Sequence, residues 1–163
     1  VDMYAKCGAL SKAQQLLDEL HVRDAVSWNA FMTGYMELGD SETVFRSFDT
    51  MLEQGFKPDA VSFLVILSAC GRMGLFDKCQ SYLESMSQNY GLDPNLEHIT
   101  EIVDLLCRMG QLDVAVEMIE RMPLRPNLVV WRAVLKMCKR WGNTEIGTEA
   151  FDKTMSCLNQ SGG

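Results

Sequence analysis

VDLLCRMG at residues 103–110 repeats the pattern of VDMYAKCG at residues 1–8, and the tripeptide RMG occurs at both 72–74 and 108–110. The glycine that closes these stretches belongs to a series with intervals of 31, 35, 36 and 32 residues: Gly8, Gly39, Gly74, Gly110 and Gly142. Self-similarity at a period of ~20–50 residues is typical of proteins built from stacked structural repeats. We therefore expect a repeat protein.

Apolar residues before each later glycine recur at i, i+3, i+4 and i+7, which is the stripe of one helix face. The copies are Trp28, Phe31, Met32, Tyr35; Phe63, Ile66, Leu67, Cys70; Ile99, Ile102, Val103, Leu106; and Trp131, Val134, Leu135, Cys138. A second amphipathic segment follows each glycine. One helix pair cannot bury its stripe alone, so the pattern predicts an all-α fold, an α-solenoid of stacked antiparallel helix pairs.

The start of each second helix is expected where an oxygen-bearing side chain follows the glycine by three residues. Such a side chain can satisfy free amides and the positive end of the helix dipole. The residues at this place are Ser11, Glu42, Asp77, Asp113 and Glu145. The Pro-Asp and Pro-Asn pairs at 58–59, 94–95 and 126–127 predict the turns between repeats.

Composition excludes several classes of protein. The chain has 163 residues, 47% of them hydrophobic, and a net charge of −7, which excludes a polybasic clamp for nucleic acid. Its longest nearly apolar stretch, Ala60 to Cys70, is far shorter than the ~20 residues of a membrane-spanning helix, so no membrane partner is expected. The six cysteines form no C-x-x-C pair, and the only histidines are His21 and His98. We expect buried reduced thiols, no metal site and no cofactor.

Residues 25–59 begin with AVSWNA, end with MLEQGFKPD, and resemble a pentatricopeptide repeat. Residues 60–95, with FLVILSAC, resemble the long variant of this repeat, and residues 96–127, with RMPLRPN, resemble the short variant. Residues 1–24 resemble a short repeat without its first seven positions. Residues 128–163, with VVW and GNTEIG, are similar to the extension motif that follows the repeats in the plant class of alternating normal, long and short units, although Arg132 and Trp141 depart from that motif.

The resemblance implies that the fifth and last residues of each repeat read one RNA base. The pairs on this chain are Asn29 with Asp59, Leu64 with Asn95, and Thr100 with Asn127. In the family the first pair favours uracil and the third favours adenine, whereas a leucine cannot hydrogen-bond a base. The resemblance also implies that apolar side chains at the second position of neighbouring repeats hold a base between them. This position is occupied by Val26, Val61 and Val129, whereas the short repeat has the charged Glu97 there. An alternative remains open, because Asx residues after proline also cap turns, and Asn29 and Thr100 are tolerated in a first helical turn.

Cations two residues before the turn glycines predict a phosphate-binding row. They are Lys6, Arg72, Arg108 and Arg140, and Glu37 interrupts the series. The alternative interpretation is that Lys and Arg favour helix C-termini.

The resemblance implies sequence-specific binding of single-stranded RNA by the C-terminal part of a longer protein, a site-recognition factor for C-to-U RNA editing in a mitochondrion or chloroplast. The chain itself is not expected to be an enzyme, because it lacks the H-x-E and C-x-x-C signatures of the zinc deaminase domain that would act in cis or in trans. Small editing cofactor proteins would bind at the long repeat, residues 60–95. Two alternatives stay open: a protein-interaction scaffold, which the negative charge favours, and an RNA-binding factor in organellar splicing or transcript stability.

Overall fold

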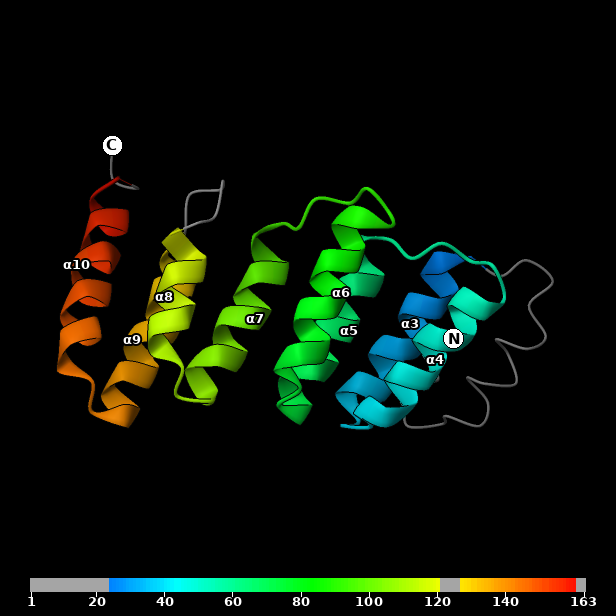
Figure 1. Cartoon of the computed structure of the whole chain (residues 1–163), viewed down its shortest axis with the longest axis horizontal. Coiled ribbons are helices and arrows are strands. Elements are labelled where there is room, and N and C mark those ends of the chain that lie inside the picture. Colours follow the sequence, from blue (N-terminus) through cyan, green and yellow to red (C-terminus); the bar gives the residue numbers. More distant parts are fainter. Residues whose placement is uncertain (1–23, 121–126, 161–163) are drawn as a thin grey trace. The chain divides into compact units, whose positions relative to one another are not determined.

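The computed structural model describes residues 24–120 and 127–160, and this part of the chain contains eight α-helices and no strand (Figure 1). The chain divides into two compact units, residues 1–94 and 95–163. The truncated repeat expected at residues 1–24, with Lys6 and His21, lies almost wholly outside the described residues. No described helix is long and apolar enough to cross a membrane.

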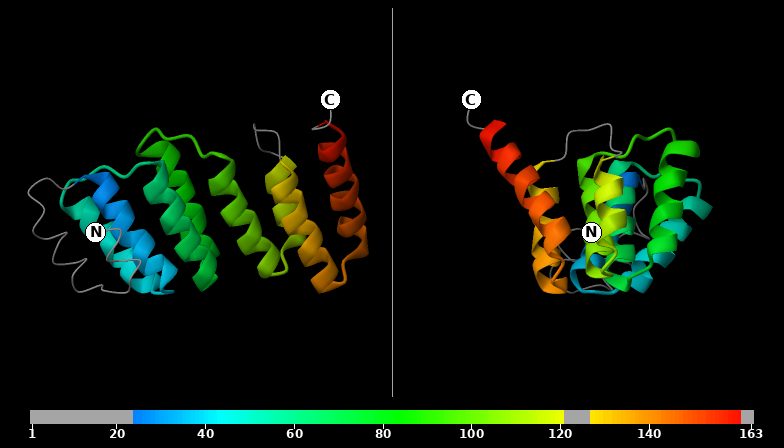
Figure 2. Two further views of the ribbon diagram at one scale, coloured as in Figure 1. Left: turned by 180° about the vertical axis from the view of Figure 1, so that it is seen from behind. Right: turned by 60° about the vertical axis from the view of Figure 1, so that its left-hand side comes forward.

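The first unit contains two helix pairs, α3 with α4 and α5 with α6. Their bounds are α3 Ala25–Glu37, α4 Ser41–Glu53, α5 Ala60–Met73 and α6 Phe76–Gln88. In each pair the second helix runs back along the first, and α5 contacts both α3 and α4 (Figures 1 and 2). The contact between the pairs is apolar: the rings of Phe48 on α4 and Phe63 on α5 meet edge to face with centroids 5.7 Å apart, and both are buried.

The second unit repeats this arrangement with α7 Leu96–Arg108, α8 Leu112–Glu120, α9 Leu128–Trp141 and α10 Thr144–Gln160. Helix α9 contacts α7, α8 and α10, so it occupies the place in this unit that α5 has beside α3 and α4. The expected all-α class and the stacked helix pairs are therefore confirmed. The assignment of the pairs to normal, long and short repeats stays a prediction.

The first helices begin where a short polar side chain caps them. Asp24, Asp59, Asn95 and Asn127 are the N-caps of α3, α5, α7 and α9, and each side chain accepts hydrogen bonds from amides of the first turn. Asx residues stabilise this position because they satisfy amides that have no partner within the helix.

The second helices correct one expectation from the sequence. Glu42, Asp77, Asp113 and Glu145 lie in the first turn, where they complement the helix dipole, but they do not cap it. The Thr43 amide instead donates to Asp40, and the Ile146 amide donates to Asn143. Helix α6 begins at Phe76, and its N-cap residue, Leu75, provides no side-chain cap.

Candidate functional site

The N-terminal ends of α3 and α5 hold the first pair of residues expected to read a base. Asn29 is on the second turn of α3 and is 6% exposed, and Asp59 is the N-cap of α5. The Asn29 Nδ2 donates to Asp59 Oδ1 at 2.9 Å, and the Ser62 hydroxyl donates to Asn29 Oδ1 at 2.6 Å. The structure thus brings together two residues that are 30 positions apart.

The Asp59 carboxyl is held ionised by this network. Burial raises its pKa, but hydrogen bonds from the Ser62 amide, the Asn29 side chain and the Ser62 hydroxyl outweigh burial and hold the pKa below its ordinary value. All of the bonds that Asp59 accepts from these groups end on Oδ1. The second carboxylate oxygen can therefore accept a hydrogen bond from a ligand.

Two exposed valines flank this network on neighbouring helices. Val26 on α3 is 69% exposed and Val61 on α5 is 51% exposed, although both are large apolar residues. An exposed apolar side chain close to a carboxylate can contact the face of a planar ring while the edge of the ring meets the carboxylate, and Val61 lies two residues after Asp59.

The second unit repeats part of this arrangement. Asn127 is exposed, and its Oδ1 accepts hydrogen bonds from the amides of Val129 and Val130 at 3.0 and 3.1 Å. Its Nδ2 donates to no group within the described residues. The Thr100 hydroxyl on α7 is half-buried and donates to the Leu96 carbonyl at 2.7 Å. Val129 is 59% exposed, but the residue at the equivalent place on α7 is Glu97, which is exposed and charged.

The pair Leu64 with Asn95, second along the chain, has one residue in each unit. Leu64 is half-buried on α5 in the first unit. Asn95 begins the second unit, where its Oδ1 accepts from the amides of Glu97 and His98. His98 is itself buried and closes a capping box by accepting from the Asn95 amide through Nδ1.

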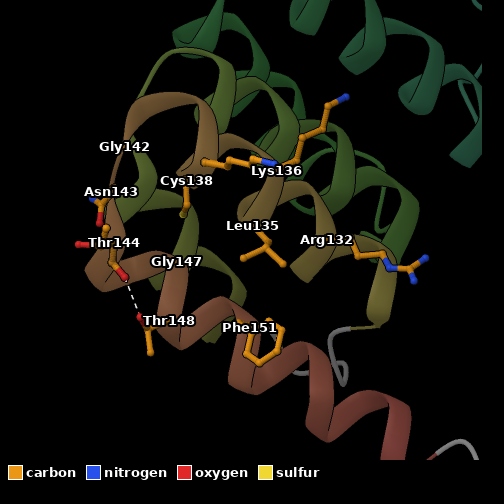
Figure 3. Close-up of a pocket in the computed structure, with 11 residues that line it drawn as sticks. Arg132, Leu135, Lys136, Cys138, Gly142, Asn143, Thr144, Gly147, Thr148 and Phe151 are labelled. Atoms are coloured by element: carbon orange, nitrogen blue, oxygen red, sulfur yellow. Dashed lines mark hydrogen bonds between the residues drawn. The ribbon is translucent and has the colours of Figure 1, made fainter.

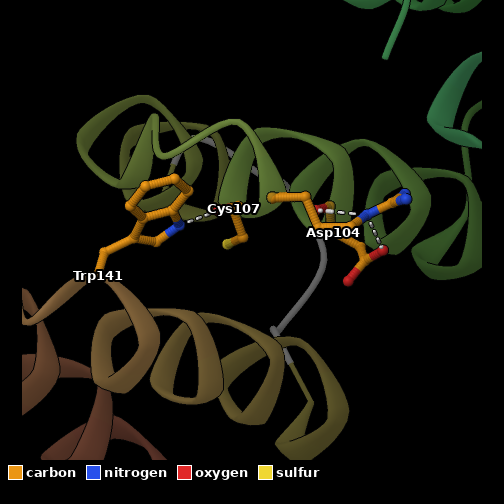
Figure 4. A network of polar contacts seen from close by, with 4 residues as sticks. Asp104, Cys107 and Trp141 are labelled. Atoms are coloured by element: carbon orange, nitrogen blue, oxygen red, sulfur yellow. Dashed lines mark hydrogen bonds and ion pairs between the residues drawn. The ribbon is translucent and has the colours of Figure 1, made fainter. Parts of the chain in front are cut away.

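The predicted phosphate-binding cations lie in the last turns of the first helices. Arg72, Arg108 and Arg140 are all exposed on α5, α7 and α9, while Lys6 lies outside the described residues. Arg108 differs from the other two because its Nε lies 2.9 Å from Asp104 Oδ2 (Figure 4). This ion pair is partly exposed and neutralises part of the charge that a phosphate would meet.

The cysteines of the described residues are reduced, and four of the five are buried core residues, as expected: Cys70, Cys79, Cys107 and Cys138. Burial, with smaller contributions from Asp104 and Cys138, raises the pKa of Cys107 to about 12. No three His, Cys, Asp or Glu side chains gather into a metal-binding group anywhere in the part of the chain that the structure describes.

Ser62 in the first unit and Trp141 in the second make contacts that the sequence did not predict. Ser62 completes a capping box with Asp59, and the D-x-x-S spacing is a signal that could have identified it. Trp141 on α9 donates from Nε1 to the Cys107 carbonyl of α7 at 3.0 Å (Figure 4). These two residues are 34 positions apart, and no local pattern connects them.

Comparison with protein families identifies the repeat unit. A model of the PPR repeat family matches residues 23–72, and the PPR repeat model matches residues 61–90 and 101–125. This chain carries pentatricopeptide repeats. Curated pentatricopeptide repeat-containing proteins of Arabidopsis thaliana are 39% identical over 152 residues and 41% identical over 153 residues, which is 93% and 94% of this chain. The chain spans only 20% and 18% of the length of these two relatives.

Solved structures with the same fold include two complexes with RNA. The pentatricopeptide repeat protein PPR10, crystallised with an 18-nt psaJ RNA element, matches 94% of this chain with a TM-score of 0.79 and 23% identity, and 24% of that chain is covered. The pentatricopeptide repeat domain of Arabidopsis thaliana protein-only RNase P 1, in complex with tRNA, matches 96% of this chain with a TM-score of 0.77 and 18% identity, and 86% of that chain is covered. At these low sequence identities, both similarities establish the fold alone.

Proposed function

We propose that this chain binds single-stranded RNA, with one base held at the N-terminal ends of each pair of neighbouring first helices. The observation that carries the proposal is the ionised, hydrogen-bonded Asp59 between two exposed valines. An unstacked base between Val26 and Val61 would present its edge to Asp59, whose carboxylate the buried Asn29 amide holds in place. Single-stranded RNA is commonly recognised in this way, by side chains that contact the edges of splayed bases.

The base preferences rest on the residue pairs. A carboxylate only accepts, so Asp59 suits the N3–H of uracil. Asn127 offers its amide as a donor because its carbonyl oxygen is used by the helix cap, and with Thr100 it is assigned to adenine. Leu64 with Asn95 has no assigned preference, so the expected order along the RNA is U, any base, then A.

The larger role we propose is that of a site-recognition factor in a plant organelle, a mitochondrion or chloroplast, acting in C-to-U RNA editing with a deaminase domain in cis or trans. It rests on the similarity of residues 128–163 to an extension motif, and one relative is named as mitochondrial. Disruption of the gene should leave specific cytidines unedited in organellar transcripts. Intact editing with unspliced or unstable transcripts would instead support the splicing or stability role.

The decisive substitution for base reading is Asn127→Asp. Aspartate keeps the oxygen that caps α9, so the fold should be retained, but it replaces the amide donor with a second acceptor. The preferred third base should shift from A towards G, whose N1–H and N2–H need acceptors, with discrimination of roughly 1–3 kcal/mol.

The measurement is competition binding with four RNAs that differ only at the third base, at fixed salt. Asn89→Asp is the matched control, because Asn89 is an exposed asparagine at the C-cap of α6. If the original chain and the Asn127→Asp variant prefer the same base, or neither prefers any, Asn127 is only a helix cap and base reading fails at this repeat.

A further inference from the structure

Two cysteines, Cys70 near the end of α5 and Cys79 in the first turn of α6, lie on either side of the turn at Gly74. Both side chains are completely buried, and both thiols are reduced. Cys70 is four residues before the turn glycine and Cys79 is five residues after it. At the other four turn glycines of the sequence, these two places never hold a pair of cysteines. The RNA binding proposed above gives the two thiols no role.

One residue, Leu75, joins the backbones of the two cysteines. The Leu75 amide donates to the Cys70 carbonyl at 3.0 Å, and the Cys79 amide donates to the Leu75 carbonyl at 3.0 Å. Gly74, just before Leu75, has φ +69° and ψ +26°. The two cysteines are therefore held by hydrogen bonds at the point where the chain reverses direction between α5 and α6.

The turn between α9 and α10 gives the distance between these two places (Figure 3). Asn143 joins Cys138 to Gly147 by the same two backbone bonds, of 3.0 and 3.2 Å, and Gly142 has φ +68° and ψ +20°. A Cβ on Gly147 would lie 3.4 Å from the Cβ of Cys138. Disulfides join cysteines whose Cβ atoms are about 3.5–4.5 Å apart. The two cysteines of the α5–α6 turn occupy the equivalent places, so a disulfide between them needs little movement of the backbone.

The two thiols also interact directly. A hydrogen bond from the Cys79 thiol, assisted by the charge of Lys78, outweighs burial and holds the pKa of Cys70 below its ordinary value. Burial has the opposite result in the second unit, where it raises the pKa of Cys107 to about 12 and also raises the pKa of Cys138. The thiolate is the reactive form of cysteine, so Cys70 is more disposed to react than those two thiols.

A small solute can reach the two thiols when the start of α6 opens. Leu75, the N-cap residue of α6, provides no side-chain cap, whereas Asp40 caps α4 at the same place after its turn glycine. A helix end whose first amides lack a capping partner opens locally at lower free energy than a capped one. Asp77 and Lys78 in this turn are already exposed, and Cys79 follows them directly. Opening of a single turn therefore uncovers the thiols.

We propose that Cys70 and Cys79 form a redox-active dithiol, which a small peroxide converts into a disulfide that locks α6 onto α5. The Cys70 thiolate attacks one peroxide oxygen, the O–O bond breaks, and the departing hydroxide takes up a proton and leaves as water. The Cys79 thiol then attacks the sulfenic acid on Cys70; the S–S bond forms, the S–O bond breaks, and a second water leaves. The two thiols lose two electrons and two protons, and hydrogen peroxide is reduced to two molecules of water.

The test treats the whole, fully reduced chain with hydrogen peroxide, alkylates the remaining thiols under denaturing conditions and locates disulfides by tandem mass spectrometry. Trypsin cleaves after Arg72 and Lys78, so the two cysteines fall on different peptides, and fragment ions distinguish Cys79 from Cys107. We expect a link between Cys70 and Cys79 within one chain, formed roughly tenfold or more faster than any modification of Cys107 and reversed by dithiothreitol. If Cys107 is oxidised first, or Cys70 links to another cysteine, the proposal fails.

Variants separate the two steps of the reaction. C79S removes the second thiol and should leave Cys70 as a sulfenic acid, which dimedone traps. C157S is the matched control, because Cys157 is a free cysteine outside the pair, and its disulfide should form at the original rate. Loss of the link in C157S would show that Cys157 is the reacting partner and would overturn the assignment to Cys79.

The locking role is measured on the original chain, so it does not depend on the folding of any variant. Hydrogen exchange of the amides in the first turn of α6 should slow roughly tenfold or more in the oxidised form, because the disulfide prevents local opening. The urea midpoint should rise, and dithiothreitol should restore both values. Equal exchange in the two forms, or a lower midpoint after oxidation, would overturn the lock. Failure of Asp59 to read a base would leave this proposal untouched, because Asp59 lies at the other end of α5.

Discussion

At the scale of single residues, the buried amide of Asn29 is one of the donors, after the Ser62 amide, that hold the pKa of Asp59 below its ordinary value. Asn29→Ala removes the bond to Asp59 Oδ1 and the acceptor of the Ser62 hydroxyl, and we expect it to lower the free energy of unfolding by about 1–2 kcal/mol. Urea unfolding at neutral pH measures this loss. Asn89→Ala removes only an exposed side-chain bond and should cost much less. Equal losses in the two variants would show that the Asn29 network does not stabilise the fold.

The same network predicts a pH effect. The pKa of Asp59 is lowered in the folded chain from its ordinary value of 3.8. The stabilisation is therefore fully present above that ordinary value and is lost as the pH falls through the lower pKa of the folded state. In Asn29→Ala the pKa of Asp59 should rise towards the ordinary value, which a carbon-13 carboxyl titration by NMR would detect. An unchanged pKa would contradict the role given to Asn29.

The sequence predicted these residues to different degrees. Asx after proline identified Asp59 as a candidate cap, and the resemblance to a repeat family paired it with Asn29. Side-chain chemistry alone could not make that pairing, because it depends on the packing of two helices 30 residues apart. The Asp104–Arg108 ion pair was not predicted, although its i, i+4 spacing is one that a helix brings together and could have indicated it.

At the scale of secondary-structure elements, Trp141 links the C-terminal ends of α7 and α9. Its indole also lies over Gly110, where a Cβ would meet ring carbons at 3.5 Å. Trp141→Phe keeps most of this packing but removes the hydrogen bond to the Cys107 carbonyl. We expect a loss of about 0.5–1.5 kcal/mol in the free energy of unfolding of the second unit. Trp141→Leu should cost more, and a Phe variant as stable as the original chain would show that water replaces the bond fully.

Two glycines of the helix pairs should respond oppositely to alanine. Gly74 ends α5 in the left-handed region with φ +69°, so Gly74→Ala should destabilise by about 1 kcal/mol although nothing lies near its Cβ. Gly147 is inside α10, where a Cβ would contact the Cβ of Cys138 at an ordinary 3.4 Å. Gly147→Ala should therefore stabilise by up to about 1 kcal/mol through helix propensity. Thermal unfolding of both variants checks the opposite signs.

The helices themselves were the most predictable elements. The spacing of the apolar residues and the turn glycines predicted both helices of each described pair. This was possible because the apolar stripe that a helix buries is visible in its own sequence. The caps of α4 and α10 lie two residues before the expected Glu42 and Glu145, at Asp40 and Asn143. A capping oxygen and a first-turn acid both stabilise a helix start, and the sequence alone does not rank them. The exposure of Phe151 could not be predicted from the sequence either, because its position in the apolar pattern is that of a core residue.

At the scale of the whole molecule, a chain of net charge −7 can bind RNA only where its cations are gathered locally. The acidic residues Asp113, Glu117 and Glu120 are exposed on the second helix α8, whereas Arg72, Arg108 and Arg140 end first helices. RNA releases counterions at each phosphate that a cation of the protein contacts. The slope of log K against log salt therefore reports how many cations contact phosphates.

The salt dependence therefore tests each arginine in turn. Removal of one phosphate contact should reduce the slope of log K against log salt by ~0.7 for single-stranded RNA, whatever its sequence. Arg72→Ala and Arg140→Ala should each show this reduction. Arg108→Ala should show less, because Asp104 already neutralises part of its charge at 2.9 Å, and Asp104→Asn should strengthen binding by releasing Arg108. Lys78→Ala on α6 is the control, since Lys78 lies over the Phe45 ring on the second-helix layer. If all four alanine variants keep the original slope, the arginines serve only to neutralise helix C-termini.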